Sequence, residues 1–403
     1  MKTIDRKQTR NLKQIRNLDL TIIFSVLCLI ATGLVLIVYA SSKPYTGDDA
    51  SMMDLFRSVN LQLAGLQFLW VILGMAGIIV MMTFDYSVFK DLSRPMFMFI
   101  VAVLVLLLII GSSKRGATAW FQFGTGENQR GLQPAEFGKL VLIIVVAKIA
   151  GSACDNSGGL VKLQDIGMVL LATGTLVALI LAQNDAGTAF VYICIMIGIM
   201  FAAKISYKFI LAGSVLGAGS FVAAYFFLME GWQQDRIREF LGTKSDELGS
   251  GYNVLHSKLA IGSGQLSGKG VFNNDSIVQL GFLPEQTTDF IFAAGIEAFG
   301  FIGGIVILLL YSVLLIRIIY VALRARDHFG TFICVGVASM FIAHIFENIG
   351  MVMGVMPVTG IPLPFISYGG SNMLANMLAV GLTLSVSMRR QTKRFRVKAR
   401  GLA

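Results

Sequence analysis

The sequence contains few charged residues, few cysteines and few prolines. Only 14% of its 403 residues are Asp, Glu, Lys or Arg, whereas soluble domains carry about 25%. The 4 cysteines are dispersed without a CxxC pair, so there is no basis for a disulfide framework or a cysteine zinc site. No Pro-rich or Ser-rich linker divides the chain, and we therefore predict one domain over residues 1–403.

Hydrophobic residues make up 55% of the chain, and the mean hydropathy is +0.74. They are arranged in long blocks of roughly 17 to 25 residues, each sufficient to cross about 30 Å of hydrocarbon. The sequence therefore predicts an all-α polytopic membrane protein with about ten transmembrane helices. The predicted spans are 19–40, 62–83, 95–112, 134–151, 164–182, 187–204, 207–228, 286–316, 330–353 and 368–388.

Ten spans place both chain ends on one side of the membrane, and the charge distribution indicates which side. With the ends in the cytoplasm, roughly twice as many Lys and Arg fall in cytoplasmic segments as in outer ones, in agreement with the positive-inside rule. The net charge of +10 is concentrated in the basic tails 1–18 and 389–403. Such tails orient helices and contact anionic lipid, which we favour over nucleic-acid binding.

Three outer segments are longer than the other connections, namely 41–61, 112–133 and 229–285. The last is the largest and includes several basic side chains, among them Arg236 and Lys269. Long loops held by rigid elements commonly carry function, so we expect the site at the extracytoplasmic face.

Two carboxylates, Glu285 and Asp289, lie in the sequence GFLPEQTTDF where this loop meets an apolar span. Pro284 suits a first helical turn, so we predict a helix that places the two acids at i and i+4, where like charges repel. Charge near hydrocarbon is costly and commonly functional. We favour a general base or metal ligand over two interfacial carboxylates bridged to loop arginines. Glu297, deeper in the span, is predicted to be a structural partner of a basic residue.

A glycine-rich stretch, GSGQLSGKG at 262–270, resembles a phosphate-binding loop only superficially. Its spacing does not match GxxxxGK[ST], and it is predicted on the opposite side of the membrane from ATP. Two interpretations remain open. The stretch forms either a backbone nest for a pyrophosphate next to Lys269 or a flexible turn.

Several polar residues lie at the predicted ends of other spans. Trp120 suits an interfacial anchor, and Pro134 suits a helix start. Glu136 and Lys139, at i and i+3, form a local ion pair or contact a lipid phosphate. Asp185, in the short turn QNDAGT, is predicted to cap the following helix.

His344, Glu347 and Asn348 share one face of a predicted span. Their HxxE pattern differs from the HExxH of zinc helices, so interhelical hydrogen bonds are the favoured interpretation. The segment Pro357–Ser371 is rich in Pro and Gly and precedes the last span. Irregular backbone at membrane depth is tolerated where it is buried in protein or lines a cavity. This segment is therefore predicted to form a wall of the site.

Together, these motifs resemble a known family, the SEDS proteins of shape, elongation, division and sporulation. In the order found in that family, the chain contains GATAWF, LQPAEFGKL, QNDAGTA, SGKGVF, PEQTTDFIF, ENIGM and PVTGIPLPFISYGGS. The resemblance extends over almost the whole chain. FISYGGS and the single-domain layout are more similar to the RodA branch of the family than to the FtsW or SpoVE branches.

The resemblance implies a peptidoglycan glycosyltransferase in the bacterial cytoplasmic membrane. Family members polymerise lipid II outside the membrane and release undecaprenyl pyrophosphate. They work with a class B penicillin-binding protein and with other elongation or division proteins. The RodA-like features imply a role in cell elongation and shape. The alternatives are a division or sporulation paralogue with the same chemistry, and a flippase for lipid-linked precursors. Because the donor is already activated as a lipid pyrophosphate, no nucleotide is expected.

The resemblance also implies site residues. The family's essential aspartate falls on Asp289, and its functionally important tryptophan falls on Trp120. We predict that Asp289 deprotonates the 4-hydroxyl of the acceptor sugar, or holds a divalent cation, Mg or Mn, near the diphosphate. Basic residues would attract the diphosphate. The predicted substrate-binding residues, in addition to Trp120, are Lys139, Asp185, Arg236, Lys269, Glu285 and Ser367.

Overall fold

The computed structural model describes residues 17–42, 59–114, 117–123, 130–227, 229, 231–240, 250–271, 273 and 275–390. Each of the ten predicted spans coincides with a helix, which confirms the helical membrane fold. Within the described ranges, eight of these helices are long and apolar enough to cross a membrane, whereas α8 and the Tyr207–Gly217 part of α9 are shorter apolar helices. The ten helices are α2 (Leu20–Ser41), α4 (Gln62–Thr83), α5 (Val88–Ile110), α6 (Pro134–Ser157), α7 (Leu163–Ala182), α8 (Ala186–Ala202), α9 (Tyr207–Phe227), α12 (Ile291–Leu323), α13 (His328–Val352) and α14 (Gly370–Met388).

The boundaries of three helices differ clearly from the predicted spans. Helix α6 ends at Ser157 rather than at 151. Helix α5 begins at Val88 and includes Pro95, whereas the span was predicted to start at 95. Hydropathy identifies only the part of a helix that is apolar enough for hydrocarbon, so it does not detect the polar first turns of α5. Helix α12 begins at Ile291, after the predicted start at 286, and continues to Leu323.

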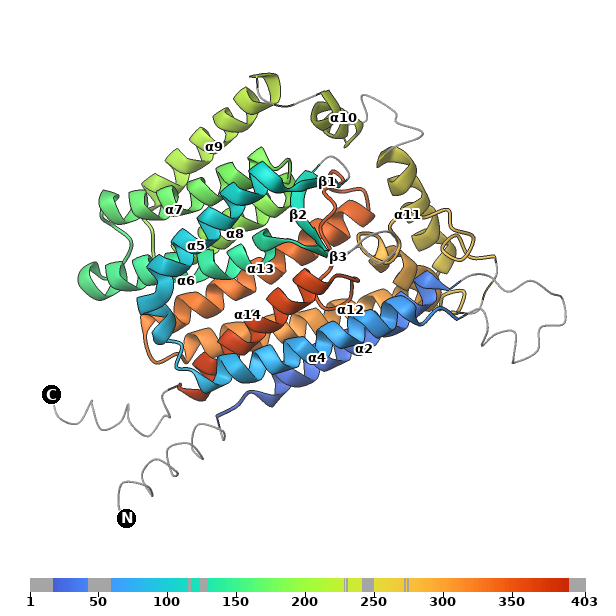
Figure 1. The fold of residues 1–403 in the computed structure, drawn as a ribbon, viewed down its shortest axis with the longest axis horizontal. Helices are drawn as coiled ribbons and strands as arrows, with labels where there is room; N and C mark the ends of the chain where they lie inside the picture. The colour runs from blue at the N-terminus through green and yellow to red at the C-terminus, as the bar shows by residue number, and fades with distance from the viewer. Residues whose placement is uncertain are drawn as a thin grey trace, which may run out of the picture.

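The long connections contain further elements that the all-α prediction did not include. Strands β1 (Ser112–Lys114), β2 (Ala117–Phe123) and β3 (Arg130–Leu132) form an antiparallel sheet in the order β1-β2-β3. The largest connection carries α10 (Gly231–Phe240) and α11 (Ser250–Gly264). These elements lie at the end of the bundle opposite the first residue of α2 and the last of α14 (Figure 1). These elements therefore share one end of the bundle.

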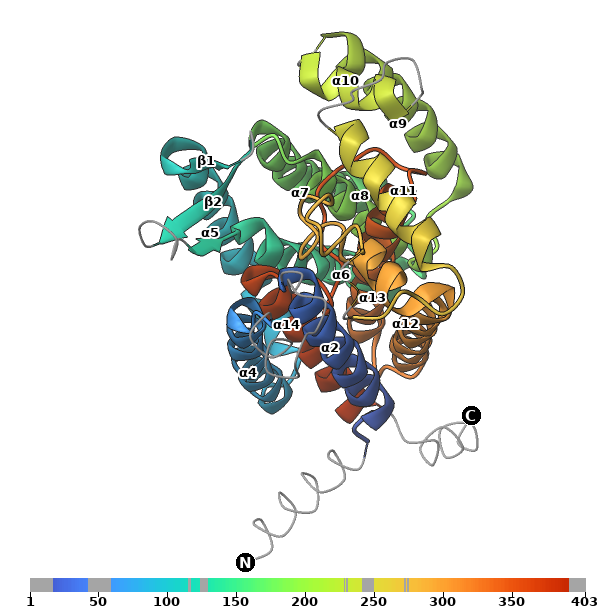
Figure 2. The same cartoon turned by 90° about the vertical axis from the view of Figure 1, so that its right-hand side faces the viewer.

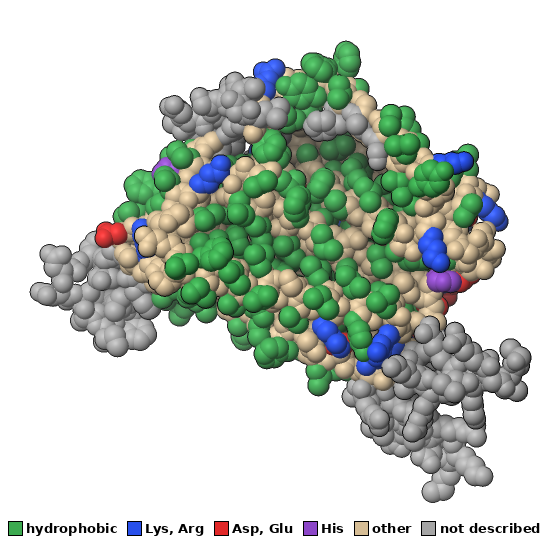
Figure 3. Space-filling model, turned by 180° about the vertical axis from the view of Figure 1, so that it is seen from behind, with side chains coloured by type: hydrophobic (Ala, Val, Ile, Leu, Met, Phe, Trp, Pro, Cys, Tyr) green, Lys and Arg blue, Asp and Glu red, His purple; other side chains and the backbone are tan. Residues whose placement is uncertain are grey.

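Helices α6, α13 and α14 form the centre of the bundle. Helix α13 packs on α6, α8 and α12, while α14 packs on α4, and α12 packs on α2. Helices α9 and α10 lie at the edge farthest from α2 and α4 (Figures 1 and 2). Apolar side chains cover a broad band of the rear surface, and most Lys and Arg side chains in view lie toward its edges (Figure 3). Such a band suits contact with hydrocarbon.

Close backbone contacts at glycine bring irregular segments into the bundle. A Cβ atom at Gly33 of α2 would lie 2.7 Å from the Cα atom of Ile366, so only glycine permits this approach. Gly300 interrupts α12 with a φ of +70° and a ψ of −171°. The segment 264–270 fills this interruption by exchanging four backbone hydrogen bonds with α12. They are Lys269 N to Glu297 O at 2.8 Å, Gly270 N to Ala298 O at 3.0 Å, Phe301 N to Gln265 O at 2.8 Å and Ile302 N to Leu266 O at 3.2 Å.

Candidate active site

The GFLPEQTTDF motif forms a tight turn in front of α12 rather than the first turn of that helix. The amide N–H groups of residues 288–290 all donate to the carbonyl of Glu285, at 3.1, 3.1 and 3.2 Å. Glu285 has a φ of +54°, a left-handed conformation that is uncommon outside glycine. The prediction that a helix places Glu285 and Asp289 at i and i+4 was wrong, because this turn redirects the chain before α12 begins.

Two buried side chains hold the backbone of this turn. Asn348 of α13 donates through Nδ2 to the carbonyls of Asp289 and Ile361, each at 2.8 Å. The Ser367 hydroxyl donates to the carbonyl of Thr288. Asn348 and Ser367 are at most 2% exposed, so they hold the turn through its backbone from the buried side. Ser367, predicted to bind substrate, therefore occupies a supporting position, and Asn348 bonds loop carbonyls rather than another helix.

Gln67, which sequence reasoning missed, holds the adjoining chain. Its Nε2 donates to the carbonyl of Ser367 at 3.1 Å, and its Oε1 accepts from the amide of Gly369 at 3.1 Å. Gln67 is 1% exposed. An amide in an apolar span is the signal that could have identified it, because a buried polar group requires a partner. Residues 357–369 are irregular, and most of residues 361–367 are buried, whereas the role of the segment as a wall of the site stays a prediction.

The Asp289 carboxylate lies against this same segment. It is half-buried, and a Cβ atom at Gly360 would lie 3.4 Å from its Oδ2 atom. Arg236 of α10 also reaches the segment, where its Nη1 donates to the carbonyl of Val358 at 3.0 Å. The structure therefore brings Asp289 and Arg236, which are distant in sequence, to the segment that contains Ser367.

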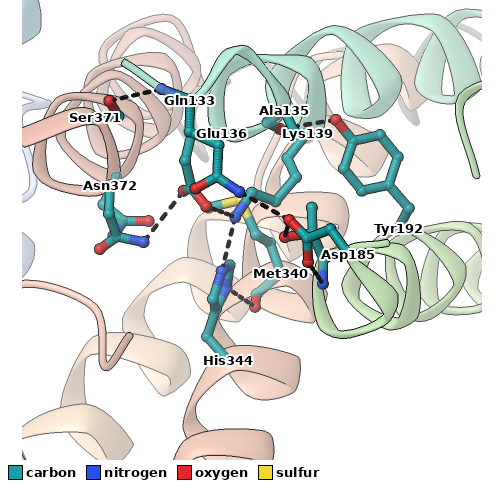
Figure 4. A network of polar contacts seen from close by, with 12 residues as sticks. Gln133, Ala135, Glu136, Lys139, Asp185, Tyr192, Met340, His344, Ser371 and Asn372 are labelled. Carbon is teal, nitrogen blue, oxygen red and sulfur yellow. Dashed lines mark hydrogen bonds and ion pairs between the residues drawn. The ribbon is translucent and has the colours of Figure 1, made fainter. Parts of the chain in front are cut away.

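A second polar cluster lies inside the bundle, between α6, α13 and α14 (Figure 4). Lys139 is 0% exposed, and its Nζ lies 2.8 Å from both Glu136 Oε1 and His344 Nε2. His344 Nδ1 lies 2.9 Å from the carbonyl of Met340, so Nδ1 carries the proton and Nε2 accepts from Lys139. Asn372 donates to Glu136 Oε2 at 3.1 Å. The local ion-pair interpretation is confirmed, and Lys139 is enclosed by protein.

Asp185 caps α8, as predicted. Its Oδ1 accepts from Thr188 N at 3.0 Å, while its Oδ2 accepts from Thr188 Oγ1 and Gln133 Nε2, each at 2.8 Å. Burial raises the pKa of the Asp185 carboxyl above its usual value, and the Thr188 hydrogen bonds offset this only in part. The backbone N–H of Gln133 donates to Ser371 Oγ at 3.1 Å. Gln133 thereby joins the Pro357–Ser371 segment to Asp185.

The glycine-rich stretch at 262–270 is not an open anion nest. The amides of Lys269 and Gly270 already donate to carbonyls of α12, so they are not available to a pyrophosphate. The Lys269 ammonium lies 3.6 Å from Glu297 Oε1, and Glu297 thus has the basic partner that was predicted. Lys269 itself is 26% exposed.

Trp120 lies on β2, beside the start of α6. It is half-buried, and a Cβ atom at Gly131 of β3 would lie 2.7 Å from its Cε3 atom. The indole therefore packs across the sheet, and its predicted contact with substrate remains a prediction.

The predicted divalent cation would depend on Asp289. In the part of the chain that the structure describes, no three His, Cys, Asp or Glu side chains converge as a metal site. The described protein ligands alone do not fit a resident cation, so substrate phosphate oxygens would have to complete its coordination.

Comparisons with known proteins identify one family over almost the whole chain. Residues 19–392 match the family FTSW_RODA_SPOVE, described as cell cycle proteins. The chain is 33% identical to the peptidoglycan glycosyltransferase MrdB of Escherichia coli K12, over 93% of this chain and 95% of MrdB. It is 35% identical to stage V sporulation protein E of Bacillus subtilis, over 92% and 96%. A chain from a solved peptidoglycan synthase complex, in which polymerization and crosslinking are coordinated, aligns with a TM-score of 0.71 and 26% identity, over 92% of this chain and 97% of that one.

Proposed function

Since the chain belongs to the FtsW, RodA and SpoVE family of cell cycle proteins, we propose that it polymerises lipid II at the outer face of the bacterial cytoplasmic membrane. The enzyme class, glycosyltransferase, follows from the family and from relatives such as MrdB. The products are a longer glycan strand and undecaprenyl pyrophosphate. The protein crosses the membrane several times, and both termini are cytoplasmic in this proposal.

The observation that carries the proposal is the position of Asp289. Its backbone carbonyl accepts from Asn348, the residue is half-buried, and its Oδ2 atom lies beside Gly360, so the residue is held in place and is partly exposed. A fixed carboxylate is suited to remove a proton from an attacking hydroxyl. Asp289 takes the proton of the acceptor 4-hydroxyl, the oxygen attacks the anomeric carbon of the donor, and the bond to the diphosphate breaks. Arg236 and Lys269 attract the diphosphate and hold it throughout the transfer.

The biological role proposed is cell elongation, based on the RodA-like FISYGGS sequence. Division and sporulation paralogues would use the same chemistry. The similar chain in the peptidoglycan synthase complex supports a partnership with a class B penicillin-binding protein, which would crosslink the strands, and with other elongation or division proteins. The proposed reaction requires no nucleotide, because its donor is already activated as a lipid diphosphate, and we propose no nucleic-acid partner.

Asp289→Ala tests the polymerase directly. Full-length protein in detergent is incubated with lipid II and a divalent salt, and the glycan products are separated on a gel. We expect wild type to form polymer. Asp289→Ala should polymerise lipid II at least about 100-fold more slowly, which is the lower end of the rate contribution of a general base. Asp91→Asn, which changes an exposed acid at the cytoplasmic start of α5, is the matched control and should retain activity.

The flippase alternative makes a different prediction for the same proteins. It predicts transbilayer movement of lipid II in vesicles, no polymer from wild type, and movement that survives Asp289→Ala. That combination of results would reject the polymerase proposal.

A further inference from the structure

Glu297 is a buried carboxylate in α12 that the chemistry at Asp289 does not use. It is 0% exposed, and it accepts hydrogen bonds from Ile277 N at 2.7 Å, Val278 N at 3.0 Å and Ser263 Oγ at 3.1 Å. A buried carboxylate with three neutral donors has little freedom to move. Glu297 thus ties two separate parts of the large outer loop to the helix that follows Asp289.

The fourth neighbour of Glu297 is a cation. Lys269 Nζ lies 3.6 Å from Glu297 Oε1 and donates to the carbonyl of Asp275 at 3.1 Å. An ammonium group has three N–H donors. Among the described residues, these two are its polar partners, and Lys269 is 26% exposed. Among these contacts only the one to Asp275 is within hydrogen-bond distance, so the described residues leave N–H donors for an anion, and the ammonium is held in place before that anion binds.

The interruption at Gly300 keeps this lysine in position. The backbone of 264–270 replaces the helical hydrogen bonds that the interruption removes from α12, and Lys269 N itself donates to the carbonyl of Glu297. The lysine is therefore anchored to Glu297 by its main chain and attracted to Glu297 by its side chain. An unwound backbone paired in this way is characteristic of binding sites built on broken membrane helices.

The position of Glu297 and Lys269 along the axis of α12, relative to Asp289, indicates which ligand Lys269 binds. Helix α12 runs from the turn at Asp289 toward Arg317, which pairs with Asp19 in front of α2. Glu297 follows Ile291, the first residue of α12, by six residues, or about 9 Å along the axis. A lipid-linked sugar places its diphosphate between the sugar and the hydrocarbon. With the sugar at Asp289, the diphosphate would lie at the inner level, where Lys269 is found.

We infer that Glu297 is a positioning residue that holds Lys269 as the cation for the diphosphate of the lipid-linked substrate. The inference rests on the proposed function for the identity of that substrate. Glu297 does not touch the reacting atoms and acts through Lys269. Its removal should therefore weaken substrate binding while leaving the proton transfer at Asp289 largely unchanged.

A double-mutant cycle tests this coupling. The full-length proteins are wild type, Glu297→Gln, Lys269→Met and the double variant. Binding of geranyl diphosphate is measured by calorimetry, and KM and kcat are measured with lipid II. We expect Glu297→Gln to raise both Kd and KM about tenfold, a value between those for exposed and buried ion pairs, with kcat within about twofold. In the Lys269→Met background, Glu297→Gln should have no further effect on Kd, because the group it positions is absent.

Ser263→Ala is the matched control. It removes one donor from the same carboxylate and leaves the charge pair with Lys269 intact, so Kd should change less than about twofold. Equal weakening by Glu297→Gln with and without Lys269, or no weakening at all, would overturn the inference.

A second measurement applies if Glu297→Gln does not fold. In wild-type protein, acylation of Lys269 by an amine-reactive ester is followed by mass spectrometry, and geranyl diphosphate should slow it. An unchanged rate contradicts the inference. Binding that depends on Glu297 without any polymer formation would refute the proposed function alone, whereas polymer formation with unchanged Glu297→Gln kinetics would refute the inference alone.

Discussion

Replacing Lys139 with methionine leaves the Glu136 carboxylate charged inside the helix bundle. In the native protein this carboxylate, 2% exposed, is 2.8 Å from the Lys139 ammonium and also accepts from Asn372. After the replacement only the Asn372 contact remains among the described partners. Breaking a buried ion pair on one side costs about 3–5 kcal/mol. We therefore expect the free energy of unfolding of Lys139→Met to fall by about that amount.

The double variant Glu136→Gln/Lys139→Met separates charge from packing. It removes the uncompensated charge, and the remaining cost is the His344 Nε2 acceptor that loses its donor, about 1–3 kcal/mol. The double variant should therefore be more stable than Lys139→Met by about 2 kcal/mol. Unfolding of the purified full-length proteins in detergent, by heat and by denaturant, provides the comparison.

Lys148→Met is the control for this prediction. Lys148 lies on the same helix, is partly exposed and donates to Ser93 Oγ at 2.9 Å, so its loss should cost about 1 kcal/mol or less. If the double variant is no more stable than Lys139→Met, an unpaired carboxylate is not the source of the loss. The reasoning about the cluster would then be refuted.

Two further predictions concern packing and pH. Gly33→Ala should destabilise the protein by about 1–3 kcal/mol, because the new Cβ atom would lie 2.7 Å from the Ile366 Cα atom. Gly65→Ala is the control: its new Cβ atom would have nothing within 4 Å, so this change should be neutral or slightly stabilising. Thermal unfolding of both variants checks this, and equal effects would contradict the contact. Burial alone would raise the pKa of Asp85, but hydrogen bonds from Ser87 and the charges of Arg389 and Arg326 lower it overall. Asp85 therefore contributes stability above its unfolded pKa of about 3.9, and this is lost as pH falls through the lower folded pKa. Melting temperatures from pH 6 down to about pH 3 should fall less steeply for Asp85→Asn than for wild type, and parallel curves would contradict the assignment.

Features that depend on neighbouring residues could be predicted from the sequence. The ten spans follow from the length of the apolar runs, because the free energy of placing a segment in hydrocarbon depends on that segment alone. The helix start at Pro134 and the cap at Asp185 are likewise local, since each requires only the next few residues. The family motifs also indicated Asp289, a match of residue order that requires no three-dimensional information.

The tertiary structure alone decided which polar groups meet. A buried side chain must pair with whichever donor or acceptor the docked helices bring near it, and sequence spacing does not report that docking. Lys139 thus pairs inside the bundle with His344, Ser367 supports the turn from behind, and Gln67 holds the wall beside it. The left-handed turn at Glu285, held by the side chains of Asn348 and Ser367, and the interruption at Gly300, filled by the backbone of 264–270, are long-range results of the same kind. In each, a part of the chain distant in sequence supplies the hydrogen bonds.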